Sequence, residues 1–88
     1  MVNNIEKYGF LQSGWQLTEI ITDGDNRTIY QAKATGDLLT SSPVWCIKRT
    51  TITVSGGVQL FVEEFADGDM NFDNVWNDRA NLTYKFAI

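Results

Sequence analysis

The chain has no histidine and only one cysteine among its 88 residues. Histidine is the commonest general base and metal ligand, and a closed zinc site needs several nitrogen or sulfur ligands. The sequence also has no Gly-x-x-x-x-Gly-Lys phosphate loop and no Gly-x-Ser-x-Gly nucleophile elbow. These absences predict a protein that is not an enzyme and that binds no cofactor.

Positive charge and long apolar runs are scarce as well. Seven basic residues face eleven acidic ones, for a net charge of −4, and the basic residues are scattered along the chain. A phosphate backbone attracts clustered positive charge, so we expect no nucleic-acid partner. No stretch approaches the roughly 18 apolar residues of a membrane span, and the first residues lack the pattern of a signal peptide, so we expect no membrane partner. The lone Cys46 excludes an internal disulfide and favours assembly in a reducing cytoplasm.

Short turn signals separate runs of alternating apolar and polar residues. This is typical of antiparallel β-structure, in which successive side chains point to opposite faces. The pattern predicts four strands and, after them, a terminal strand with a clean alternation: 15–22, 27–34, 44–54, 58–65 and 82–88. The turns Asp23-Gly24-Asp25 and Ser55-Gly56-Gly57 predict that the first four strands form two hairpins.

Two segments depart from simple alternation. Along 44–54 the apolar residues change phase, from Trp45 and Ile47 to Ile52 and Val54, which predicts a bulge or a strand that passes between two packing surfaces. Between residues 67 and 80 the apolar spacing is helical, and we expect a short helical turn near residues 71–80, with Asp69 or Asn71 as its cap. The predicted fold is therefore all-β: a small antiparallel β-sandwich or barrel with about five strands and one short helical turn.

The sequence divides into a single β-rich domain, residues 15–88, and a less regular N-terminal segment, residues 1–14. That segment is either an arm that orders against a partner or an edge strand of the domain itself. Its apolar residues and the aromatic residue that follows it are the predicted partner-binding residues: Tyr8, Phe10, Leu11 and Trp15. Of the three tryptophans, we expect two to lie in the core, because large aromatic side chains contribute most to a thin interior.

Oxygen ligands recur at alternate positions in one segment, as they do in a calcium-binding loop. The candidate ligands are Asp67, Asp69, Asn71 and Asp73. An EF-hand loop that began at Asp67 would have glycine sixth and glutamate twelfth, where this chain has Phe72 and Asp78. Aspartate, asparagine and glycine are also the residues of ordinary tight turns, so we expect no metal site here. Glu63 and Glu64 are neighbours on a strand, which predicts opposite faces and no shared acid–base site.

The part from residue 27 to 84 resembles a family of small structural proteins of tailed bacteriophages. The resemblance rests on a Trp-x-Ile-x-Arg strand at Trp45, an Ala-Asp-Gly turn at Ala66, a Trp-x-x-Arg segment at Trp76 and a Leu-Thr-Tyr triplet at Leu82. It implies a virion component of the capsid surface, neck or tail, with other virion proteins as partners, in many symmetric copies. The expected location is the virion, after assembly in the host cytoplasm. Arg79 is expected to pair with Asp67, Asp69 or Asp73.

Two other functions stay open at this point. One is a carbohydrate-binding module at the particle surface that uses an exposed tryptophan. The other is a small acidic phage protein that inhibits a host protein. All three are binding functions, which agrees with the absence of catalytic residues.

Overall fold

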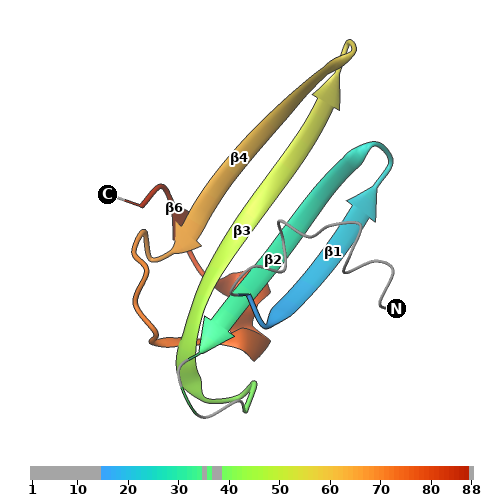
Figure 1. Cartoon of the computed structure of the whole chain (residues 1–88). Helices are drawn as coiled ribbons and strands as arrows, with labels where there is room; N and C mark the ends of the chain where they lie inside the picture. Colours follow the sequence, from blue (N-terminus) through green and yellow to red (C-terminus); the bar gives the residue numbers. More distant parts are fainter. Residues whose placement is uncertain (1–14, 35, 37–38, 88) are drawn as a thin grey trace.

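The computed structural model describes residues 15–34, 36 and 39–87. They form one antiparallel sheet that is not closed (Figure 1). Its long strands pair in chain order and are β1 (Leu17–Asp23), β2 (Asn26–Ala34), β3 (Pro43–Ser55) and β4 (Val58–Ala66). Two strands of two residues each complete the sheet: β5 (Asn74–Val75) pairs with β3, and β6 (Tyr84–Lys85) pairs with β4. Between these two lies the 3₁₀ helix η1 (Trp76–Asn81).

Both predicted hairpins are present, and each has a two-residue turn. In the β3–β4 turn, Gly56 and Gly57 have φ angles of 58° and 81°, and Ser55 pairs with Val58 on either side of them. A two-residue turn with positive φ at both central positions matches the twist of the flanking strands, and glycine adopts positive φ without steric cost. This hairpin is longer than the β1–β2 hairpin and projects beyond it (Figure 1).

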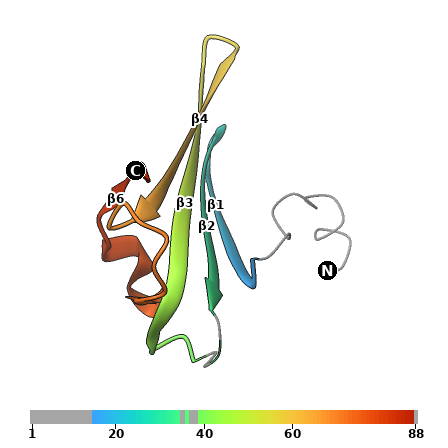
Figure 2. The ribbon, with the colours of Figure 1, turned by 60° about the vertical axis from the view of Figure 1, so that its left-hand side comes forward.

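The core lies on one face of the sheet, which we call the first face. Figure 2 shows η1 and β6 on this side of the strands. The buried cluster between the two layers consists of Tyr30, Ala32, Trp45, Ile47, Ala66, Trp76 and Tyr84. Two of the three tryptophans are therefore in the core, as predicted. The short 3₁₀ helix η1 and the short C-terminal strand β6 cover these sheet residues.

We call the opposite side of the sheet the second face. The phase change along β3 arises because some of its apolar residues point to this face and others to the first. Pairing of β3 with β2 and β4 is continuous from Trp45 to Ser55, so the predicted bulge at the phase change is wrong. The one irregularity lies between Pro43 and Trp45, where β5 pairs. Instead, Trp45 and Ile47 point to the first face while Ile52 points to the second, so the strand serves two surfaces along its length.

The all-β class, the antiparallel pairing and the short helical turn agree with the prediction. The details of the C-terminal part differ. The helix begins later than predicted, at Trp76, and its N-cap Val75 makes no side-chain capping bond, so the predicted cap at Asp69 or Asn71 is wrong. The terminal strand is limited to Tyr84 and Lys85, which pair with Ala66 and Phe65 of β4, so it is much shorter than predicted. No helix in the described part of the chain is long and apolar enough to cross a membrane.

Candidate binding surface

The second face carries a shallow groove of about 190 Å³. Three neighbouring strands supply its walls, β2, β3 and β4, and the lining residues are Ile29, Gln31, Lys48, Thr50, Ile52, Phe61 and Glu63. These residues lie together because alternate side chains of paired strands share a face: Ile29 pairs with Thr50, and Ile52 pairs with Phe61. Most of the exposed groove surface is apolar, and Ile29, Ile52 and Phe61 supply its large apolar side chains.

One ion pair borders this groove. The Lys48 Nζ donates to Glu63 Oε2 at 3.0 Å, and the lysine side chain is only 15% exposed. The neighbouring Arg49 pairs with Glu64 at 2.9 Å. The two glutamates point to opposite faces and each has its own basic partner, as the alternation predicted. Across-strand pairing thus neutralises both negative charges of β4 within the chain.

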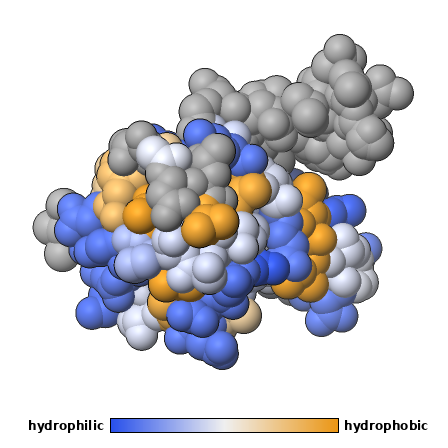
Figure 3. All heavy atoms as spheres, turned by 90° about the horizontal axis from the view of Figure 1, so that it is seen from below, coloured by the Kyte–Doolittle hydropathy of each residue, from blue (hydrophilic) through white to orange (hydrophobic). Residues whose placement is uncertain are grey.

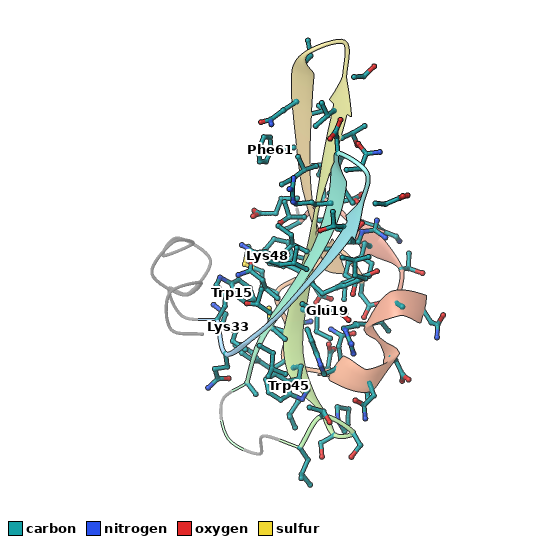
Figure 4. The ribbon with its side chains drawn as sticks, turned by 90° about the vertical axis from the view of Figure 1, so that its right-hand side faces the viewer. Trp15, Glu19, Lys33, Trp45, Lys48 and Phe61 are labelled. Carbon is teal, nitrogen blue, oxygen red and sulfur yellow. The ribbon has the colours of Figure 1, made fainter. Side chains whose placement is uncertain are left out.

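Trp15, a predicted partner-binding residue, lies against the second face. The Nζ atoms of Lys33 and Lys48 lie 4.8 and 4.6 Å from the centre of its ring, which is the geometry of a cation–π contact for each lysine. Figure 4 shows Trp15, Lys33, Lys48 and Phe61 on the side of the strands away from η1. The tryptophan precedes β1, so the strand alternation does not dictate its direction. Tyr8, Phe10 and Leu11, the other predicted contact residues, lie outside the described residues, as does the whole of segment 1–14.

The far half of the β3–β4 hairpin exposes three large apolar side chains in close sequence. Val58, Leu60 and Phe61 are 66%, 59% and 60% exposed. Phe61 points to the second face, where it ends the groove, and Leu60 points to the first face beyond the reach of η1. At the opposite end of the molecule, the apolar side chains are in separate clusters among hydrophilic ones (Figure 3). Exposed apolar residues also follow one another on β1, at Ile20 and Ile21, but these are 42% and 46% exposed, less than the three side chains of β4.

The carboxylates of the candidate calcium loop do not converge. Within the described residues, no group of three or more Asp, Glu, Cys or His side chains lies close enough to hold a metal ion. Two of the four predicted ligands are engaged in local bonds instead. Asp69 Oδ1 accepts the Asn71 backbone N–H at 3.0 Å, and Asp73 Oδ1 accepts the Asn74 side-chain amide at 3.2 Å. These are the short-range bonds of an ordinary turn.

Cys46 lies on β3 and is buried. Burial raises the pKa of its thiol above the ordinary value, because an apolar environment disfavours the charged thiolate. The side chain is therefore held as a neutral thiol and contributes to packing, as predicted for a small hydrophobic residue between Trp45 and Ile47.

Arg79 links the covering layer, η1 and β6, to the first face of the sheet. Its Nε donates to Glu19 Oε1 at 2.8 Å, its guanidinium lies 4.4 Å from the Trp76 ring centre, and its carbonyl accepts the Tyr84 hydroxyl at 2.8 Å. The predicted partners Asp67, Asp69 and Asp73 are wrong, because η1 presents Arg79 to β1 rather than to the turn after β4. The bond from Arg79 lowers the pKa of Glu19 below its usual value.

This lowered pKa predicts a pH-dependent contribution to stability. The Glu19→Gln variant is expected to be less stable than the wild type at about pH 7, by no more than about 1 kcal/mol because the pair is partly exposed. The difference is fully present above the unfolded carboxyl pKa of 4.5 and is lost as the pH falls through the lower folded value. Urea denaturation at about pH 7 and at about pH 3 measures it. In an Arg79→Gln background the pH-dependent difference should vanish, and a difference that grows toward acid pH would contradict the assignment.

No protein-family model, no curated protein and no solved structure matches this chain.

The exposed apolar residues of β4 are not among the partner-binding residues that the sequence predicted. A signal for them is present: between residues 58 and 62 both alternation phases are apolar, whereas a sheet with one covered face needs only one apolar phase. Such an excess predicts a strand that is covered on both sides. The structure instead leaves Val58, Leu60 and Phe61 exposed.

Proposed function

We propose that this protein is a non-enzymatic structural component of a bacteriophage particle that binds other virion proteins through the β3–β4 hairpin and the adjoining groove. The observation that carries the binding part is the exposure of three large apolar side chains, Val58, Leu60 and Phe61, on one strand. Val58 and Leu60 lie on the first face and Phe61 on the second, so both faces of the hairpin expose apolar surface, which commonly marks a site that another protein covers. The virion part is supported by the resemblance of residues 27–84 to small phage structural proteins.

The surface has the composition of a protein contact. An aromatic anchor, Phe61, stands at the end of an apolar groove, and the charged residues at its border, Lys48 and Glu63, already satisfy each other. Apolar anchors with a polar rim are the usual arrangement of a protein interface. Trp45 and Trp76 are buried. A carbohydrate platform therefore has to rely on Trp15, which two lysines flank.

Quantitative mass spectrometry of purified particles tests the proposal. We expect many copies per particle with the wild-type chain. With Phe61→Ser we expect the copy number to fall at least about tenfold, because loss of a central apolar anchor weakens binding strongly. Asn77→Ser is the matched control, since this exposed residue of η1 belongs to the opposite side of the molecule, and it should leave the copy number unchanged.

Complete absence of the wild-type chain from particles would overturn the proposal and would favour an inhibitor of a host protein. A glycan-array signal that is lost in Trp15→Ala and kept in Phe61→Ser would favour the carbohydrate-binding module instead.

A further inference from the structure

The outer edge of β4 is unpaired over most of its length. On one side β4 pairs with β3 from Val58 to Phe65, and on the other β6 reaches only Phe65 and Ala66. From Val58 to Glu64, the outer edge therefore has no strand partner among the described residues. An unpaired edge presents backbone N–H and C=O groups that another strand can bind.

The backbone groups that face this edge follow from two features of the hairpin. Asp67 donates its backbone N–H to Thr83 O at 2.7 Å, toward β6, and backbone groups of alternate residues in an antiparallel strand point to the same side. At the other end, Ser55 and Val58 close a two-residue turn and face each other. Both features place the N–H and C=O groups of Gln59, Phe61 and Glu63 on the outer edge.

This edge also lacks the usual protection against pairing. Natural edge strands are commonly blocked by lysine, proline, a bulge or an uncompensated inward charge. The segment Val58–Glu64 contains no lysine or proline, and its pairing with β3 is regular throughout. Its two negative charges are compensated within the chain by Lys48 and Arg49. Neither the backbone nor the side chains of this segment prevent another strand from pairing with the outer edge of β4.

We propose that two copies of this chain pair antiparallel through the outer edges of β4, around a twofold axis at Phe61, to form one continuous sheet. The pairing uses the backbone edge of β4, whereas the proposed binding surface uses exposed side chains of the same strand, so a backbone variant and a side-chain variant test them separately. A twofold pairing requires a strand that is complementary to itself, and the β4 sequence meets this requirement in one register.

In the register centred on Phe61, the outward-facing residues oppose outward-facing residues. Phe61 lies opposite Phe61 of the second copy, and Gln59 lies opposite Glu63 of the second copy, so all three outward residues of each strand can exchange backbone hydrogen bonds. Leu60 lies opposite Val62, which places apolar side chains together on the first face. No like charges are directly opposed.

The neighbouring registers are poorer. A pairing centred on Val62 places Phe61 opposite Glu63 and Leu60 opposite Glu64, and it sets Gln59 against Phe65, whose edge β6 already occupies. A pairing centred on Leu60 sets Glu63 against Gly57, which lies in the turn with φ of 81°. The supply of free, regular backbone groups thus selects the register centred on Phe61, and this self-complementary stretch of edge identifies a second copy as the occupant.

Sedimentation velocity of the purified chain over a wide concentration range tests the pairing, with Gln59→Pro and Gln59→Ala as a matched pair. Proline removes an N–H that points away from β3, so the monomer keeps its ladder, whereas the dimer loses one bond at each of two symmetric positions. We expect a concentration-dependent dimer for the wild type and for Gln59→Ala. For Gln59→Pro we expect about tenfold to a hundredfold weaker association.

A cysteine scan tests the register and does not depend on the proline variant. Directly opposed residues of a hydrogen-bonded pair have Cα atoms about 5.5 Å apart, within reach of a disulfide. Under mild oxidation Phe61→Cys should give a covalent dimer, while Leu60→Cys, Val62→Cys and the wild type, whose Cys46 is buried, should not. A wild type that stays monomeric throughout, a dimer insensitive to Gln59→Pro, or preferential cross-linking at position 60 or 62 would overturn the proposal. None of these results would bear on the copy number in particles.

Discussion

Replacing Trp45 by alanine is expected to lower the free energy of unfolding by about 3–5 kcal/mol, the usual loss for a large aromatic side chain removed from a core. The indole is 1% exposed and packs on the first face of the sheet beneath η1. Its Nε1 also donates to the Leu39 carbonyl at 3.0 Å, which ties the segment before β3 to the core. A domain of this size is stable by only about 5–15 kcal/mol, so the loss is a large share of the total. Urea denaturation followed by circular dichroism measures it.

Trp15→Ala is the matched control for this experiment. Trp15 is half-buried at the surface between two lysines, so its removal leaves no internal cavity and should lower the stability by about 1 kcal/mol. An effect of Trp45→Ala no larger than that of Trp15→Ala would contradict the assignment of Trp45 to the core.

Trp76→Ala is expected to have an effect of similar size, about 3–5 kcal/mol. Trp76 is the only buried residue of η1, and it is 8% exposed. Its ring contacts the guanidinium of Arg79, and Arg79 in turn binds Glu19 on β1. Loss of the ring should therefore loosen η1 and β6 together. Hydrogen exchange at the Lys85 amide and at the Asp67 amide, which donates to Thr83 O, measured beside the denaturation curve, should be faster than in the wild type.

Asn77→Ala provides the control in the same helix. The Asn77 side chain is exposed, and its fixed contact is a backbone bond from its N–H to Thr40 O, which alanine retains. Its stability should stay within about 0.5 kcal/mol of the wild type. A denaturation curve for Trp76→Ala that coincides with that of Asn77→Ala would show that η1 does not hold the core.

Local patterns predicted the sheet well because they depend on neighbouring residues. Alternation located all four long strands to within two residues at each end, and Gly24 and Gly56 marked the two turns. The alternation of Glu63 and Glu64 likewise gave their opposite directions. These features follow from the period of an extended strand and from the backbone angles that glycine permits.

Local patterns of this kind do not predict contacts between segments that are distant in the sequence. Arg79 binds Glu19, 60 positions away, and no local signal distinguishes this carboxylate from the aspartates nearer to Arg79. The same reason applies to the cap of η1, since the helix begins where Trp76 reaches the sheet and not where a capping side chain is available. The groove on the second face also required the pairing of three strands before its lining residues could be identified.

The order of the strands has a consequence for how the chain acquires its structure during synthesis. Each long strand pairs with the one just before it, so the sheet can grow one hairpin at a time and only short loops have to close. The segment that covers Trp45 and Ile47 comes last, at residues 74–85. A nascent chain therefore exposes this apolar surface to water until residues 74–85 have also left the ribosome, and during that interval it is most prone to aggregation and to chaperone binding.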